Sequence, residues 1–189
     1  KVILSLATVV AAAAVPSAAY AQLAFNAGAV TDYRYRGISQ TRLKPAVQGG
    51  VDFAAGGFYV GAWASSVKWI KDAGGDAPAE IDVYGGYKGD IVKDSLTFDV
   101  GVLSYQYPGH KLSVSPVTTE VYGALTFGPA TVKYSHAVTN LFGFSDSKNS
   151  GYLDLSASFD VGGGVMLAPH VGYQKVSGNS DFSYTDVAL

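Results

Sequence analysis

The sequence predicts an all-β protein, an antiparallel up-and-down transmembrane β-barrel of about 12 strands in its full-length form. Three patterns indicate this fold: polar and apolar residues alternate along most strands, short and long connections alternate, and aromatic residues gather near strand ends. Successive side chains of a strand point to opposite faces, so alternation gives one apolar and one polar face. Beyond residue 21, no stretch reaches the roughly 20 apolar residues that a membrane-spanning helix needs.

Residues 1–21 have the features of a secretory signal peptide that is cleaved after Ala21. Lys1 precedes a small and apolar run at 2–15, which is too short to cross a bilayer. Pro16 and the small residues Ala19 and Ala21 disfavour the alternative, a buried N-terminal helix. We therefore expect export to the bacterial outer membrane, with residues 22–189 forming one barrel domain.

The charge and the lack of cysteine exclude several classes of function. Of 13 Lys and Arg residues, Lys1 lies in the leader, which leaves 12 against 15 Asp and Glu. This mildly acidic balance offers no basic surface for nucleic acid. With no cysteine, disulfides and thiolate metal sites are excluded. We expect no metal and no other cofactor.

Nine strands and the start of a tenth follow from the alternation and from turn residues in a chain with 23 glycines. The predicted strands are 23–36, 46–53, 58–67, 80–87, 96–105, 119–127, 131–138, 151–159 and 165–174, with another starting near Phe182.

The connections between these strands alternate in length. The tight ones are 54–57, 88–95, 128–129 and 160–164, and the mostly longer ones are 37–45, 68–79, 106–118, 139–150 and 176–181. Outer-membrane barrels have short periplasmic turns and longer external loops, so the pattern favours a barrel with a periplasmic N-terminus.

Aromatic residues lie near both ends of the predicted strands, as in the interfacial girdles of membrane barrels. One predicted belt, near the tight turns, comprises Phe25, Phe53, Phe58, Tyr87, Phe98, Phe127 and Phe159. The other, near the long loops, comprises Tyr33, Tyr35, Trp69, Tyr105, Tyr107 and Tyr173.

The residues between the belts divide into two faces. The expected lipid-facing set is Val47, Val51, Ile81, Val83, Val100, Val102, Val121, Leu125, Val132, Tyr134, Leu153, Leu155, Leu167 and Val171. The opposite face is too charged for a dry core, because burying unpaired charges is costly, so we expect it to line an aqueous lumen. The strand at 58–67 does not declare which of its faces points inward.

The charged residues assigned to the lumen are the candidate site. They are seven acids, Asp32, Asp52, Glu80, Asp82, Asp99, Glu120 and Asp154, and three bases, Arg34, Arg36 and Lys133. A negative wall favours cations, so we expect a weak cation preference. Asp32, Arg34 and Arg36 share one face of the first predicted strand, where they could form a selective constriction or a static salt-bridge network.

Three segments carry a resemblance to a known family. Residues 25–41 (FNAGAVTDYRYRGISQT) resemble the start of mature TorF-family porins, and residues 57–65 (GFYVGAWAS) and 80–87 (EIDVYGGY) are similar to the next blocks of that family. The resemblance covers most of the mature chain and implies an outer-membrane barrel that acts as a porin.

The C-terminus departs from that family. Outer-membrane barrels of this kind usually end in a closing strand with a terminal aromatic residue, which the outer-membrane assembly machinery reads, whereas this chain ends Asp186-Val187-Ala188-Leu189. An open sheet edge in lipid would leave backbone groups without partners. We therefore expect the domain to be incomplete at its C-terminus, with two further strands giving about twelve.

The function that these patterns favour is passive diffusion of small hydrophilic solutes or ions through an outer-membrane channel in contact with lipid. The main alternative is a non-conducting barrel with a structural or adhesive role; a barrel enzyme acting on envelope lipids is a weaker one. No H-E-x-x-H or G-x-S-x-G motif surrounds His110, His136 or His170, so we expect no enzyme. A soluble lipocalin-like binding protein would line its cavity with apolar residues, against the pattern seen.

Overall fold

The computed structural model describes residues 21–189. Residues 1–20 of the predicted signal peptide therefore lie outside the described residues. Ten strands form one sheet in which every neighbouring pair is antiparallel and follows the chain order, so the all-β prediction is confirmed. They are β1 (Gln22–Val30), β4 (Ala46–Ala55), β5 (Phe58–Ser66), β6 (Ala79–Val92), β7 (Leu96–Gln106), β8 (Thr118–Phe127), β9 (Ala130–Ala137), β10 (Gly151–Ala157), β13 (His170–Lys175) and β14 (Tyr184–Ala188).

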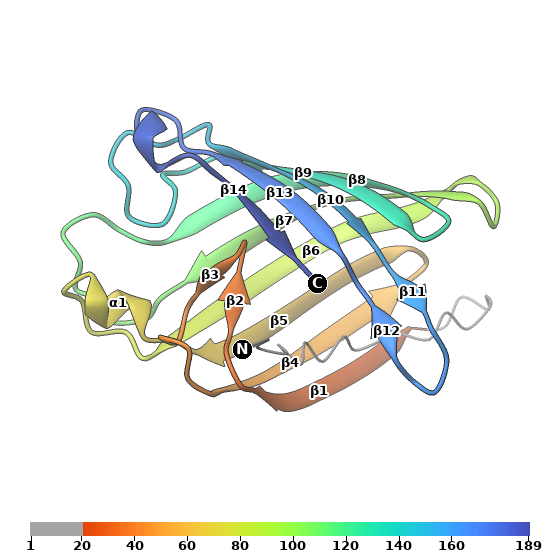
Figure 1. Cartoon of the computed structure of the whole chain (residues 1–189), viewed down its shortest axis with the longest axis horizontal. Coiled ribbons are helices and arrows are strands. Elements are labelled where there is room, and N and C mark those ends of the chain that lie inside the picture. Colours follow the sequence, from red (N-terminus) through yellow and green to blue (C-terminus); the bar gives the residue numbers. More distant parts are fainter. Residues whose placement is uncertain (1–20) are drawn as a thin grey trace.

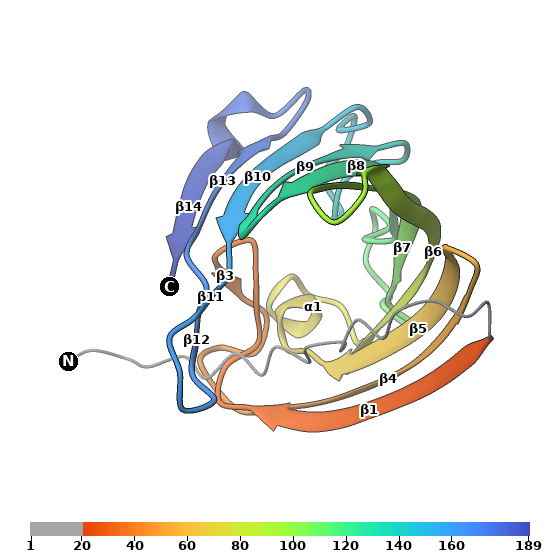
Figure 2. The same cartoon turned by 90° about the vertical axis from the view of Figure 1, so that its right-hand side faces the viewer.

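The sheet curls around a central space, with β1 and β14 on the two sides of the remaining gap (Figure 2). Within the described residues, β1 pairs only with β4 and β14 only with β13. The sheet is therefore open along these two edges, and the closed barrel stays a prediction.

The alternation of short and long connections is present in the structure. The strands join through two or three residues at 56–57, 93–95 and 128–129, whereas residues 31–45, 67–78, 107–117, 138–150 and 176–183 form long connections. The long connections lie together at one end of the sheet, which also carries the short helix α1 (Trp69–Asp72) and the single turn η1 (Ser180–Phe182) (Figure 1). None of the helices in residues 21–189 is long and apolar enough to cross a membrane.

The connection from β10 to β13 differs from the expected tight turn. It carries a separate hairpin of β11 (Phe159–Asp160) and β12 (Met166–Leu167), so the predicted strands 151–159 and 165–174 are each interrupted. The main ladder ends at the pair Ser156 and His170. Pro169, the next residue on the β13 side, has no N–H to donate to β10, which explains why the ladder stops there.

The two faces of the sheet agree with the predicted alternation. Val83 and Val100 are each 48% exposed on the outer face, while Glu80 and Glu120 are each 2% exposed on the inner face. The strand whose orientation the sequence left open, β5, presents Phe58 and Val60 outward and turns Tyr59 inward. The outer surface is thus a broad apolar band.

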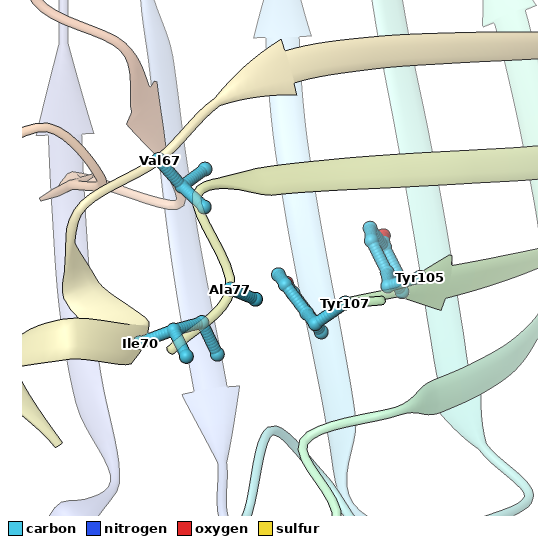
Figure 3. Packing of buried hydrophobic residues seen from close by; sticks show 5 residues of the cluster. All are labelled: Val67, Ile70, Ala77, Tyr105 and Tyr107. Atoms are coloured by element: carbon cyan, nitrogen blue, oxygen red, sulfur yellow. The ribbon is translucent and has the colours of Figure 1, made fainter. Parts of the chain in front are cut away.

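Only one of the two aromatic belts lies on the outer surface. Near the short turns, Phe25, Phe53, Phe58, Tyr87, Phe127 and Phe159 are exposed, as expected, while Phe98, the seventh member of this predicted belt, is half-buried. Near the long connections, the predicted belt is wrong for all but Tyr173, because Tyr105 and Tyr107 are 3% and 2% exposed and form an internal cluster with Val67, Ile70 and Ala77 (Figure 3). Tyr33, Tyr35 and Trp69 pack against the same cluster. Apart from Tyr173, the aromatic residues of this predicted belt therefore pack inside the curl.

Interior tyrosines lie across glycines of a neighbouring strand. Tyr84 covers Gly61, Tyr59 covers Gly86, Tyr122 covers Gly101 and Tyr152 covers Gly172. The closest case is Gly172, where an added Cβ would lie 1.9 Å from the Tyr152 hydroxyl oxygen and 2.4 Å from the ring carbon that carries it. A glycine at this position lets the ring lie flat along the inner wall.

We expect Gly172→Ala to lower the free energy of unfolding by about 1–3 kcal/mol, the usual cost of overpacking, because the rigid Tyr152 ring must move. Urea unfolding in lipid vesicles would measure the loss. Gly123→Ala is the matched control: the nearest atom to a Cβ there is Val100 Cγ1 at 3.9 Å, so its stability should be unchanged or slightly raised. Equal losses in both variants would contradict the packing argument.

Candidate functional site

The segment that follows β1 leaves the sheet and folds into the space inside the curl (Figure 2). Within it, β2 (Arg34–Tyr35) and β3 (Ile38–Ser39) form a hairpin with Arg36 and Gly37 at its tip. Both tip residues have positive φ, 46° and 77°, as a two-residue type I′ turn requires. We call β2, the tip and β3 the inner hairpin.

The predicted first strand, 23–36, is therefore wrong beyond Val30. Asp32 ends the ladder because its carboxylate accepts hydrogen bonds from Ser39 Oγ at 2.5 Å and from Arg34 Nε at 2.7 Å, a local network that competes with strand pairing. Asp32, Arg34 and Arg36 consequently do not share one strand face. Arg34 stays 43% exposed beside Asp32, whereas Arg36 reaches across the interior.

Arg36 makes a bidentate ion pair with Glu120 of β8, with N···O distances of 3.0 and 2.7 Å. It also donates to Gln174 Oε1 of β13 at 2.8 Å. The side chains of Arg36 and Glu120 are only 6% and 3% exposed, so this pair is shielded from solvent. Arg36, Glu120 and Gln174 together are called the Arg36 latch below.

Aromatic rings and a further strand support the Arg36 latch. The guanidinium lies over the rings of Tyr35 and Tyr152, at 4.7 and 4.2 Å from their centroids. Tyr184 of β14 donates to the Arg36 carbonyl oxygen at 3.1 Å. An arginine rarely adopts a positive φ, so these contacts must hold the tip in a conformation that the residue itself disfavours.

Glu80 of β6 is held by two phenols. Tyr33 donates to Oε1 at 2.6 Å and Tyr107 donates to Oε2 at 2.5 Å. Burial raises the pKa of Tyr33 and of Tyr107 well above the ordinary phenol value, and the Glu80 carboxylate raises both further. Both hydroxyls therefore keep their protons and act as donors.

Asp82 lies two residues along β6 from Glu80 on the same inner face, and it is 8% exposed. Its Oδ1 atom is buried and has no hydrogen-bond partner among residues 21–189. Opposite it in the sheet stand Trp63 of β5 and Tyr105 of β7. Asp82 thus has a buried oxygen without a hydrogen-bond donor, whereas both oxygens of Glu80 and of Glu120 accept hydrogen bonds.

The remaining inward acids have partners. Asp52 accepts from Tyr84 at 2.5 Å, and Asp99 accepts from Tyr59 at 2.5 Å. Tyr59 also contacts the hydroxyl of Tyr122, whose ring lies 4.0 Å from Lys133 Nζ. This part of the wall therefore consists of carboxylates paired with tyrosine hydroxyls.

A histidine joins two further carboxylates next to the β14 edge. His170 Nδ1 lies 2.7 Å from Asp154 Oδ2, and His170 Nε2 lies 3.1 Å from Asp186 Oδ1. Tyr152 also approaches Asp186, at 3.1 Å. Both ring nitrogens of His170 thus face carboxylates.

Residues 21–189 line at least two cavities inside the curl. One, of about 780 Å³, lies between the two open sheet edges and is lined by Asp32, Arg34, Gln48, Trp63, Asp154 and His170 among others. The second, of about 510 Å³, lies among the long connections and is mainly aromatic, with Tyr35, Trp69, Phe142, Phe144, Phe182 and Tyr184 in its wall. The Arg36 side of the inner hairpin borders both cavities.

The sequence placed most of these charges on the correct face. Asp52, Glu80, Asp82, Asp99, Glu120, Lys133 and Asp154 all lie on inward positions of their strands. Their role in selectivity stays a prediction. The sequence did not indicate that Asp186 belongs to the inner face, that the tyrosines act as hydrogen-bond donors, or which contacts Gln174 makes. For Asp186 a signal was available, because it has the same parity as Tyr184. Within the described part of the chain, no three His, Asp or Glu side chains converge in a way that could hold a metal ion.

A comparison with protein families matches residues 13–189 to Gcw_chp, described as a bacterial protein of unknown function. The chain belongs to this family. Comparisons with curated proteins and with solved structures gave no significant match. In this Gcw_chp chain, the matched region contains the whole sheet, the inner hairpin and all ten candidate charges.

Proposed function

We propose that the protein is an outer-membrane β-barrel through which small hydrophilic solutes or ions diffuse passively, with a weak preference for cations. One observation carries the proposal: a single meandering antiparallel sheet presents exposed aliphatic side chains on its outer face and charges on its inner face. Outer-membrane barrels have this inversion of the ordinary soluble pattern. The resemblance to TorF-family porins supports the same function.

The open edges of the sheet support a larger barrel. In lipid, the free backbone groups of β1 and β14 would each cost several kcal/mol, so a membrane-embedded sheet has to be closed. Two further strands between these edges would bring the barrel to about twelve, an even number as in other bacterial single-chain barrels. Closure by such strands would rely on the outer-membrane assembly machinery.

The interior charge supports the cation preference. Asp186 adds an eighth carboxylate to the seven acids expected from the sequence, while the bases remain Arg34, Arg36 and Lys133, with His170 between two carboxylates. A pathway with more fixed negative than positive charge attracts cations. The Arg36 latch and the internal aromatic cluster narrow the interior near the long connections, so we expect small ions to pass more readily than sugars.

The test is conductance of the full-length protein in planar bilayers, together with swelling of sugar-loaded liposomes. We expect discrete current steps, a reversal potential on the cation side in a KCl gradient, and slow swelling that falls with solute size. A folded protein that gives neither steps nor swelling would overturn the proposal, and an anion-side potential would overturn the cation preference.

A second candidate is a non-conducting barrel with a structural or adhesive role. The observation that favours it is the burial of the interior at one level, where Glu80 and Glu120 are each 2% exposed and Arg36 bridges two distant strands. A permanent closure at this level would stop conduction. The same bilayer experiment separates the two candidates, because a non-conducting barrel should give no current steps.

A further inference from the structure

We propose that Asp82 is the site at which a monovalent cation binds on its way through the barrel, and that this one residue sets most of the cation preference. The inference rests on the proposed channel function and narrows it from a general wall charge to a single carboxylate. The inward carboxylates differ in the partners that their oxygens have.

At the narrow level of the interior, the acids other than Asp82 already have a hydrogen-bond or ionic partner on each oxygen. Glu120 has both oxygens on the Arg36 guanidinium, at 3.0 and 2.7 Å. Glu80 has one phenol on each oxygen, at 2.6 and 2.5 Å. Both oxygens of each of these two carboxylates are thus already engaged by a donor.

The acids farther from this level are half-buried and hold partners as well. Asp52 and Asp99 each accept from a tyrosine, and Asp154 lies against His170. Because their side chains remain partly open to the interior, water can screen their charge, and a passing ion interacts with them weakly.

Asp82 combines burial with an unmet oxygen. It is 8% exposed, and its Oδ1 has no partner among the described residues. The charges that act on it most strongly are the carboxylates of Glu80 and Glu120, both repulsive. A carboxylate buried in such surroundings is stable only if it meets a positive charge or takes up a proton. When all three carboxylates at this level are ionised, they exceed the one Arg36 guanidinium by two negative charges, which a bound cation would reduce.

The chemistry selects a monovalent cation. A divalent ion such as Ca²⁺ needs six to eight oxygen ligands, and one free carboxylate oxygen falls far short of that number. Conduction also requires an ion that binds strongly enough to enter and weakly enough to leave. A hydrated K⁺ or Na⁺ at a single carboxylate meets this condition.

The deciding variant is Asp82→Asn, which keeps the shape of the side chain and removes its charge. In a KCl gradient across a planar bilayer, we expect the K⁺ to Cl⁻ permeability ratio to fall to near one. Asp52→Asn removes the same charge from the same face but from a carboxylate already held by Tyr84, and it should keep most of the preference. An Asp82→Asn channel that conducts with unaltered selectivity would overturn the inference. This is also the result expected if Asp82 carries a proton in the wild type.

A second measurement does not depend on conduction. Urea unfolding of the vesicle-bound protein is compared in KCl and in choline chloride, whose cation is too bulky for the site. We expect KCl to raise the unfolding midpoint of the wild type but not that of Asp82→Asn, and the variant to be the more stable protein in choline. A wild-type midpoint that is equal in the two salts would overturn the cation site, whereas a K⁺ effect in a silent protein would overturn only the channel.

Discussion

Replacing Arg36 with alanine is expected to lower the free energy of unfolding by about 3–5 kcal/mol, because it leaves a buried carboxylate without its ionic partner. Glu120 would keep only the Tyr105 hydroxyl, at 3.3 Å, while its side chain stays 3% exposed. The inner hairpin would also lose its anchor to β13 at Gln174. We therefore expect the released hairpin to widen the pathway, with larger current steps than the wild type.

The measurement pairs urea unfolding in vesicles with single-channel recording. Arg42→Ala is the control, because Arg42 forms an ion pair with Asp72 on the exposed surface of the long connections, and such pairs contribute little. The double variant Arg36→Ala with Glu120→Ala should recover part of the stability, since no unpaired charge remains. A loss no greater than that of Arg42→Ala would contradict the role of the Arg36 latch.

Replacing Val102 with arginine is expected to cost about 2–4 kcal/mol, the depth-dependent cost of a cation on the lipid face at the middle of a membrane barrel. Val102 lies at the centre of β7 and is 43% exposed on the outer face. On a soluble protein, an arginine at such a position would be harmless.

Ile91→Arg is the matched variant for this test. Ile91 is 56% exposed near the turn that ends β6, so in a membrane it would lie close to the interface and the same substitution should cost only about 0–1 kcal/mol. Unfolding in vesicles of both variants measures the difference. Equal and negligible costs at the two positions would contradict the membrane location.

The sequence predicted the sheet well where alternation and turn chemistry agree. From Ala46 to Ala137, each predicted strand overlaps an observed one, and the ends differ most for β6, which continues to Val92. The extension is understandable, because the ladder runs on past Tyr87 to a bulge between Asp90 and Val92, and lysine and glycine in that stretch weaken the strand signal.

The inner hairpin could not be predicted from the same signal. Tyr33 and Tyr35 alternate with Arg34 and Arg36 both in a continued strand and in a hairpin, so the pattern at 31–36 is the same in either case. The hairpin is favoured by the hydrogen bond from Ser39 to Asp32 and by the ion pair of Arg36 with Glu120. Neither contact can be predicted from the local sequence.

For the aromatic belt predicted near the long connections, the sequence contained a signal against an outward position. Tyr105 has the same parity as Asp99, which the alternation already assigned to the inside, so its ring belongs with the inward set. The predicted belt follows proximity to a strand end instead of parity. For Tyr107, which lies beyond the end of β7, parity carries no information, and only the packing against Val67 and Ile70 places it.

The contacts of Arg36 also impose an order of events on assembly. Its partners Glu120 and Gln174 lie 84 and 138 residues farther along the chain, so the hairpin cannot dock until the late strands have been delivered. A segment made among the first is then fixed among the last. Until the late strands are in place, the interior of the sheet lacks the inner hairpin, and the pairing of Arg36 with Glu120 marks the end of folding.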